Sequence, residues 1–470
     1  MPPRSSPLPT PTILLPGLPP KTLVGIDLLT FTSTANFHGI RDLPEGWHFL
    51  YTGTTESFSL RCGGWFYIGD IQSAGAAGQD ASTAVTRRTL GGNGADATEV
   101  RVWKWNQDVE ALVPIIGNSS EEKQEAMRYK ANLSAIWQSG GLFRYRSRIS
   151  STAVGGREED RDLDDVDNQK EGRSDWVGLT DKISPQLLSR ILGDPDVDVD
   201  GKPRWTVTSG STALRDADQI PGLTSQEATS ADGTAAEQEK DLRFLPVDLK
   251  RTWREGAVGR ERTEAAQDRS WALGDMVRRV SQDGDEQTGE RQILGELQFT
   301  FLMVLTLMNY SCLEQWKRLL GLIFTCRAAV PARESFFTDV LRLLRLQLKR
   351  CDDVEGGLFE MDGDNGAEFL VKLLTGFKRT VDELRDGVGF AVKFELGVFE
   401  KWVKEEFNWE LKKDAIVRRG MLELEDGEQV EMEMNDADED DETGEYAPVI
   451  VDLGGGDGSP SPELDMKDNE

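Results

Sequence analysis

The spacing of apolar residues changes once along the chain, and this change limits the fold more than any other feature. Between residues 25 and 105 the apolar residues form short runs of aromatic and β-branched types, such as 47–51 and 64–68, separated by Gly, Pro, Asn and Asp. Runs of this kind are typical of β-strands. From Thr263 onward the apolar residues recur with a period of about 3.6, which is typical of amphipathic helices. The sequence therefore predicts an α+β protein of two domains, the first β-rich and the second all-helical.

Composition sets the predicted limits of these domains and of the segments around them. Stretches with few large apolar side chains cannot bury enough surface to offset the entropy lost on ordering, so we expect them to be disordered. The predicted segments, in chain order, are a Pro-rich disordered start (1–20), a β-rich domain (21–150) with a floppy insert (70–97), a connecting helical segment (151–192), a disordered linker (193–240), a helical domain (241–412) and an acidic disordered tail (413–470) with a strand-like segment at 446–453.

Helices are predicted in both halves of the chain. The capping-box pair Ser119 and Glu122 predicts a helix start in the first half. In the second domain, segments with the helical period lie near 263–281, 290–310, 311–327, 332–350, 367–385 and 389–411. In the last of these, Phe394, Val398 and Trp402 recur every four residues, and we expect them to pack against neighbouring helices.

An uncharged run, residues 297–313, crosses from the predicted segment 290–310 into the next one, and its length approaches the roughly 20 residues that a bilayer span requires. Polar residues within the run and charged residues just after it favour a buried core helix over a membrane anchor. The N-terminus, broken by prolines, lacks the continuous apolar segment of a signal peptide. We therefore expect a protein of the cytoplasm and nucleus that does not contact a membrane.

The chain is strongly acidic. Its 83 Asp and Glu residues against 54 Lys and Arg give a formal net charge of -29 at pH 7. Residues 421–470 hold 19 acidic residues and one lysine, and so contribute -18 of that charge. Because such a charge repels a phosphate backbone and an anionic lipid surface, we expect no direct sequence-specific binding to nucleic acid.

Residues suited to catalysis or metal binding are scarce. His38 and His48 are the two histidines of the chain, and with Asp42 and Glu45 they could hold one zinc ion, although structural histidines are the favoured interpretation. The chain has four cysteines, Cys62, Cys312, Cys326 and Cys351, and no two of them have the spacing of metal ligands. No GxSxG, P-loop or dinucleotide-binding motif occurs at a strand-to-helix turn. We expect no enzyme activity, no cofactor and no metal.

A short positive ribbon lies in the β-rich domain. Arg144, Arg146 and Arg148 are separated by single residues, and the aromatic residues Phe143 and Tyr145 lie beside them. Such a pattern could contact RNA. Within so acidic a chain, an exposed edge strand or a protein-facing patch is the favoured interpretation.

A short apolar segment interrupts the acidic tail. Its residues are Tyr446, Ala447, Pro448, Val449, Ile450, Val451, Asp452 and Leu453. Its β-branched centre favours a strand, but the acidic and glycine residues around it offer no partner strand, so we expect it to join the sheet of another protein. A flexible tether of about 35 residues after Leu411 reaches roughly 33 Å, which suffices to cross a neighbouring domain. The alternatives are an incidental apolar patch and pairing with the chain's own β-rich domain.

Two groups of motifs carry a resemblance to a known family. In the N-terminal region the motif residues are Gly25, Ile26, Asp27, Phe37, Gly39, Pro44, Gly46, His48 and Phe49. In the helical domain they are Gly295, Glu296, Leu297, Gln298 and Phe299, followed by Trp316, Lys317 and Leu319. In this order and spacing they resemble the motifs of the AAR-two family, the splicing factors named for the A-one cistron. The resemblance covers both predicted domains and misses the Pro-rich start, the inserts and most of the tail.

The resemblance implies a fold, a partner and a mode of action. Members of the family pair a β-sandwich-like N-terminal domain with a VHS-like helical domain, and they assist assembly of the U-five small nuclear ribonucleoprotein. They hold its large scaffold protein, Prp-eight, at the RNase-H-like and Jab/MPN domains, in part through a tail that adds a strand, and they keep the Brr-two helicase off. On this chain the tail role would belong to residues 446–453. A trafficking adaptor whose VHS-like domain binds sorting peptides is the alternative, because a fold alone does not fix a function.

Overall fold

The computed structural model describes the residues 10–54, 60–71, 99–148, 158–213, 216, 241–281, 284–351, 358, 366–384, 389–411, 418–423 and 429–434. The chain divides into a large unit, residues 1–248 with 252–412, and a small unit, residues 249–251 with 413–470. The large unit contains both the β-rich region and the helical region. The predicted tail strand at 446–453, the Pro-rich residues 1–9 and most of the predicted inserts lie outside the described residues.

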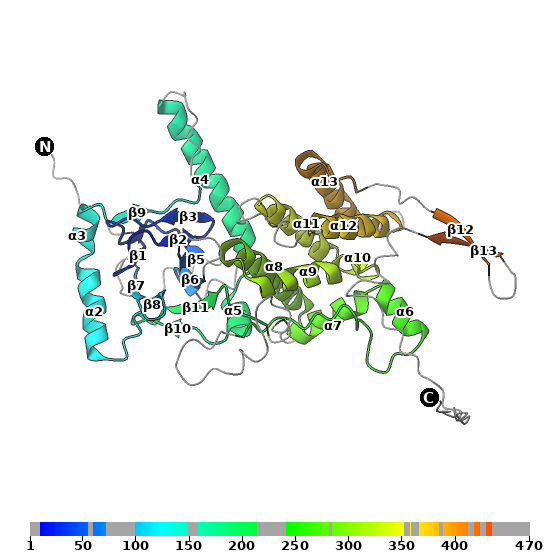
Figure 1. Cartoon of the computed structure of the whole chain (residues 1–470), viewed down its shortest axis with the longest axis horizontal. Helices are drawn as coiled ribbons and strands as arrows, with labels where there is room; N and C mark the ends of the chain where they lie inside the picture. Colours follow the sequence, from blue (N-terminus) through cyan, green and yellow to red (C-terminus); the bar gives the residue numbers. More distant parts are fainter. Residues whose placement is uncertain are drawn as a thin grey trace, which may run out of the picture. The chain divides into compact units, whose positions relative to one another are not determined.

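The β-rich region consists of two sheets (Figure 1). The strands of the five-stranded sheet, in spatial order, are β8 (Ala111–Pro114), β7 (Val100–Asn106), β1 (Thr12–Leu14), β4 (Gly39–Arg41) and β9 (Leu142–Arg144). The strands of the six-stranded sheet are β10 (Asp196–Val197), β11 (Pro203–Thr208), β6 (Arg61–Ile68), β5 (Gly46–Gly53), β2 (Leu23–Ile26) and β3 (Leu29–Thr32). The predicted runs 47–51 and 64–68 are antiparallel neighbours in this sheet.

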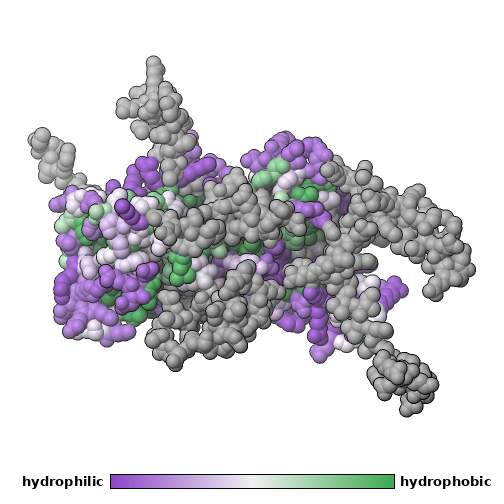
Figure 2. Space-filling view, viewed as in Figure 1, coloured by the Kyte–Doolittle hydropathy of each residue, from purple (hydrophilic) through white to green (hydrophobic). Residues whose placement is uncertain are grey.

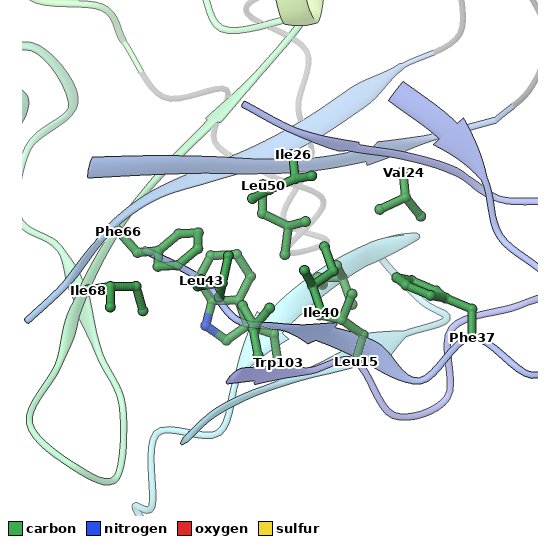
Figure 3. Close-up of a cluster of buried hydrophobic side chains, with 12 residues drawn as sticks. Leu15, Val24, Ile26, Phe37, Ile40, Leu43, Leu50, Phe66, Ile68 and Trp103 are labelled. Carbon is green, nitrogen blue, oxygen red and sulfur yellow. The ribbon is translucent and has the colours of Figure 1, made fainter. Parts of the chain in front are cut away.

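Apolar side chains from both sheets form one core between them. Figure 3 shows Ile26 and Leu50 of the six-stranded sheet pointing toward Ile40 of the five-stranded sheet. Phe66 and Trp103 meet across the core edge to face, with ring centroids 5.1 Å apart, and each is at most 1% exposed. Burying one such side chain contributes about 1.5–3 kcal/mol to folding. The sandwich-like arrangement that the resemblance implied is therefore confirmed.

Strands β5 and β6 are buried on both faces, because helices cover the face of their sheet that points away from this core. The Trp65 ring stacks on Trp176 of α4 (Glu158–Thr180) at 6.0 Å and lies 6.3 Å from Phe299 of α8 (Glu286–Leu307). A strand buried on both sides reads as a continuous apolar run rather than an alternating one. This explains the unbroken aromatic runs in the sequence.

Two predictions of disorder are wrong in part. Residues 10–20 contain β1, which pairs with β4 and β7 and buries Ile13 completely. Residues 193–213 contain β10 and β11, and β11 pairs with β6 so that Trp205 is 2% exposed. Both segments are short and lie beside Pro, Gly or Asp, so their composition resembles that of a loop although long-range pairing orders them.

The prediction that the acidic tail is disordered outside the strand-like segment 446–453 is also wrong in part. In the small unit, β12 (Arg418–Glu423) and β13 (Gln429–Met434) pair antiparallel as a hairpin, with Leu422 opposite Val430. The sequence of β13 alternates apolar and polar residues, which is a strand pattern. The prediction gave more weight to the negative charge than to this alternation.

The helical region follows the predicted segments closely. Its helices are α6 (Arg260–Gln267), α7 (Ser270–Val280), α8, α9 (Tyr310–Ile323), α10 (Ala329–Ala332), α11 (Glu334–Leu348), α12 (Gly366–Asp382) and α13 (Phe390–Phe407). In the first half, the helices that the structure describes beside α4 are α2 (Ser120–Ala131), α3 (Leu133–Gln138) and α5 (Pro185–Leu192). The predicted start of α2 at Ser119 is confirmed, because the Ser119 hydroxyl accepts the Glu122 amide at 3.1 Å. The Glu122 carboxylate reaches back as predicted, but it accepts the amide of Asn118, one residue before the cap, at 2.8 Å.

The uncharged run 297–313 forms parts of two helices rather than one. Met308 adopts a left-handed conformation that ends α8, and the Asn309 side chain accepts the Cys312 amide at 2.9 Å and so begins α9. Leu297 and Phe301 are completely buried in protein. Among the described helices, none has the length and apolar character needed to span a bilayer. The interpretation of the run as a buried core helix is confirmed.

Candidate protein-binding site

The first group of motif residues meets at the turn between β2 and β3. Asp27 occupies this turn with a left-handed backbone, φ 56°, and its carboxylate is buried. The carboxylate accepts the Phe49 amide at 3.0 Å, His48 Nδ1 at 2.8 Å and the Tyr145 hydroxyl at 2.6 Å. Burial, and then the Asp27 carboxylate, raise the pKa of Tyr145 well above its ordinary value. This Asp27 cluster fixes the β2–β3 hairpin to the core.

His48 has a structural role in this cluster. Its Nδ1 faces the Asp27 carboxylate and its Nε2 faces the Pro44 carbonyl oxygen at 2.8 Å. Both ring nitrogens therefore lie within hydrogen-bond distance of an oxygen atom of the protein, and neither is left for a metal. His38 Nδ1 lies 3.0 Å from the Asn36 carbonyl oxygen instead. Within the described ranges, no three His, Cys, Asp or Glu side chains are grouped closely enough to hold a metal ion.

Gly25 makes room for the ring that supports β3. A Cβ atom at this position would lie 2.0 Å from the Tyr51 ring, so any larger residue would displace that ring. The Tyr51 hydroxyl is 2.7 Å from the Thr30 hydroxyl in the middle of β3. Gly25 therefore allows Tyr51 to contact the middle of β3, and Asp27 fixes the turn from which β3 begins.

The remaining motif residues of the first group lie around the same core. Phe37 is 3% exposed and packs edge to face against Phe31 and Phe143, at 5.2 and 4.8 Å. Gly39 begins β4, Gly46 begins β5, and Ile26 lies in the core opposite Leu50. These residues form the core or the strand ends of the sandwich, and their positions do not indicate a ligand-binding site.

The second group of motif residues joins the two halves of the large unit, that is, the β-rich region with its helices and the helical region. Glu296 is completely buried in α8. Its carboxylate accepts the Leu245 amide at 3.0 Å, Gln315 Nε2 at 2.7 Å and Arg190 Nη1 at 2.7 Å. These donors come from an extended segment, from α9 and from α5. One buried carboxylate therefore connects three separate parts of the chain, and its charge is compensated by Arg190.

Gln298 and Gly295 complete this interface. The Gln298 amide donates to the Gly178 carbonyl at 2.9 Å and accepts the Lys182 amide at 2.9 Å, so it holds the C-terminal end of α4. A Cβ atom on Gly295 would lie 2.7 Å from the Lys182 carbonyl oxygen, so only glycine allows α8 to approach this segment. We call Glu296, Gln298 and the residues they bond the Glu296 joint.

The other motif residues of the helical region lie around the Glu296 joint and contact the helices that surround it. Trp316 Nε1 donates to Gln347 Oε1 at 3.0 Å, and Gln347 Nε2 donates to the Leu297 carbonyl at 3.0 Å. Leu319 is completely buried, and the Lys317 ammonium lies 5.9 Å from the ring centroid of Phe369. The sequence resemblance located these residues, but it did not reveal which contacts they make.

The helical region also exposes an apolar surface on α13, where the sequence predicted buried side chains. Phe390, Phe394 and Val398 of α13 are 74%, 63% and 37% exposed, although the prediction had Phe394 and Val398 packed against other helices. Residues four apart share one face of a helix, so these three form a continuous stripe, which we call the α13 stripe. Figure 2 shows apolar surface beside polar surface where Figure 1 places α13.

The opposite face of α13 carries a second set of apolar residues, and it is this set that packs inward. Its buried members are Val392, Leu396, Phe399 and Val403. Trp402 lies between the two faces and contacts Phe399 and Phe407, with ring centroids 6.2 and 5.7 Å away. Exposed apolar groups gathered on one surface are typical of protein-binding sites.

Arg144 of the arginine ribbon lies in β9, at the edge of the five-stranded sheet, and Arg146 and Arg148 follow this strand. The prediction of an edge strand is therefore confirmed for Arg144. Arg144 is exposed and lies 3.4 Å from Asp42, and Arg148 pairs with Glu171 at 2.9 Å. Carboxylates of the same chain therefore partly neutralise the positive charge that RNA would require.

Comparison with known proteins assigns the family. A model of the AAR2 N-terminal domain matches residues 9–193, and a model of the AAR2 C-terminal repeat region matches residues 244–412. The chain belongs to the AAR2 family. The first match begins before β1 and ends after α5, so it includes segments that the composition had placed outside the β-rich domain. The two matched ranges correspond to the two halves of the large unit.

Relatives support this assignment at low identity. The chain is 22% identical to the protein named Protein AAR2 homolog of Homo sapiens over 346 residues, which cover 72% of this chain and 75% of that one. The values for the Pongo abelii homologue are the same. The Oryctolagus cuniculus homologue is 36% identical over 182 residues, or 37% of this chain and 52% of the homologue. Neither these names nor the family descriptions state a catalytic activity.

Proposed function

We propose that this AAR2-family protein is a non-catalytic pre-mRNA splicing factor that assists assembly of the U-five small nuclear ribonucleoprotein. It binds the large scaffold protein Prp-eight at the RNase-H-like and Jab/MPN domains and blocks premature loading of the Brr-two helicase. It acts by occupying partner surfaces, in the cytoplasm and the nucleus. The observation that supports this proposal most strongly is that AAR2 family models match both halves of the large unit.

The geometry supports a binding role in two ways. The Glu296 joint fixes the β-rich and helical halves to each other, so surfaces on both halves are presented to a partner in one arrangement. The α13 stripe leaves apolar side chains exposed on a stable helix. Several weak contacts on one rigid body add in free energy, and the loss of one weakens all the others.

The tail segment 446–453 supplies the test of this proposal. Val449→Asp together with Val451→Asp places two charges where a strand would enter a partner sheet, so we expect binding to the scaffold fragment to weaken at least tenfold. The matched control, Gly456→Asp with Gly458→Asp, adds the same charge just beyond the segment and should bind within about twofold of the unaltered chain. The measurement is a calorimetric titration with a scaffold fragment that contains the RNase-H-like and Jab/MPN domains.

Two results would count against the proposal in different ways. If the unaltered chain does not bind the scaffold fragment, the proposed function is wrong. If both altered chains bind as tightly as the unaltered one, the scaffold remains the partner but the tail does not contribute a strand.

A further inference from the structure

Each sheet edge in a soluble protein exposes unpaired backbone groups, and most edges carry features that prevent pairing. In the part of the chain that the structure describes, β8, β9, β10 and β3 end the two sheets. Three of them are protected: β8 ends at Pro114, β9 carries Arg144, and β10 has two residues, one of them Asp196. The fourth edge, β3, has the sequence Leu-Thr-Phe-Thr, with neither a charge nor a proline.

The open side of β3 can be assigned from its hydrogen bonds. The Ser33 amide donates to the Thr22 carbonyl at 2.8 Å, so the backbone groups of Ser33 point toward the β2 side. Backbone groups in an antiparallel pair alternate in direction, so those of Phe31 also point toward β2, whereas those of Thr30 and Thr32 point away from the sheet. The side chains of Thr30 and Thr32 are exposed as well.

The hairpin that carries this edge is held in place. The Asp27 cluster anchors its turn, and the Tyr51 hydroxyl contacts Thr30 at 2.7 Å. Phe31 contacts Phe143 on the core side, with ring centroids 5.9 Å apart. A fixed edge loses little entropy when another strand pairs with it, which favours binding.

We infer that β3 accepts an extended segment of a protein partner as an additional strand. The inward side chains of that segment would lie beside Leu29 and Phe31, which are half-buried, so they should be apolar. Its other side chains would lie beside the exposed Thr30 and Thr32, so they should be polar or β-branched. The absence of charge on β3 favours a backbone ladder over a nucleic acid or a charged peptide. The identity of the partner as the scaffold rests on the proposed function.

Hydrogen exchange of the full chain tests this inference directly. In the free protein the amides of Thr30 and Thr32 should exchange rapidly, while that of Phe31 should be protected by β2. In the complex with the scaffold fragment all three should be protected. Protection of Thr30 and Thr32 in the free protein would overturn the inference, because a segment of this chain would then already cover the edge. Rapid exchange of both amides in the formed complex would also overturn it.

A proline substitution gives an independent test. Thr32→Pro removes an outward amide without removing a bond to β2, and proline is tolerated on the open side of an edge strand. We expect binding to the scaffold fragment to weaken about tenfold, the usual effect of losing one backbone hydrogen bond in a complex. The matched control Thr32→Val keeps the amide and should bind within about twofold of the unaltered chain.

The outcomes separate the two proposals. Equal binding by both variants, with exchange unchanged in the complex, would overturn the role of β3 alone. Failure of the unaltered chain to bind the scaffold fragment would overturn the proposed function, and the assignment of the partner with it. If Thr32→Pro lowers the unfolding temperature, the exchange measurement on the unaltered chain decides the matter.

Discussion

Glu296 and Phe394 belong to the same helical region, yet each lies where simple hydrophobicity would place the other. The carboxylate of Glu296 is completely buried and receives donors from three parts of the chain, whereas the Phe394 ring is 63% exposed. The motif residue therefore maintains the fold, and the residue outside the motifs contributes to an exposed apolar surface. The contrast indicates that the motif residues lie in the interior, at the joint and in the sandwich core, while the α13 stripe lies outside the motifs.

The largest expected effect is at the joint. Glu296→Ala leaves the Arg190 guanidinium and the Leu245 amide without their acceptor, so we expect the free energy of unfolding to fall by about 3–5 kcal/mol. Urea denaturation monitored by tryptophan fluorescence measures this change. The control Glu405→Ala removes an exposed carboxylate 3.8 Å from Lys401 and should change stability by less than about 0.5 kcal/mol. Similar losses from both substitutions would remove the distinction between joint and surface.

The two faces of α13 give the next largest effect. Phe399→Ala empties a site that is 1% exposed, so we expect a loss of about 3–5 kcal/mol. Phe394→Ala, five residues earlier on the open face, should cost less than about 0.5 kcal/mol. The same denaturation experiment compares them. A large loss from Phe394→Ala would mean that the α13 stripe is part of the core, as the sequence pattern had predicted.

The smallest effect tests the Asp27 cluster. Because the pKa of Tyr145 is raised in the folded protein, the unfolded chain loses this proton first as the pH increases. The contribution of the Tyr145 hydroxyl, about 1 kcal/mol, should therefore be fully present below pH ~10 and be lost as the pH rises above it. The measurement is the difference in unfolding free energy between the unaltered chain and Tyr145→Phe from pH 8 upward. A difference independent of pH would contradict the assignment.

Much of the fold could be predicted from the sequence, because its elements are encoded locally. The aromatic runs of β5 and β6, the N-cap of α2 and the periods of α8 and α11 are each contained within a few turns or one strand. Strand β1 could not be found in this way. It has three residues, and its partners β4 and β7 lie about 27 and 88 residues further along the chain, so its order depends on distant pairing.

The candidate surfaces were harder to predict than the joint. Helix α13 has apolar residues on both faces, and a period of about 3.6 does not indicate which face meets the core. The resemblance located Glu296, but its donors at Arg190, Leu245 and Gln315 come from segments that only the fold brings together. The open edge at β3 has no sequence motif of its own and became visible once the strand order was known.

The central proposal is that this chain binds a protein scaffold through surfaces outside its family motifs. Titration of the full, unaltered chain with the fragment carrying the RNase-H-like and Jab/MPN domains tests that claim most directly. We predict saturable binding with one chain per fragment, at concentrations where both remain folded. A flat titration, with both proteins shown to be folded, would contradict the claim.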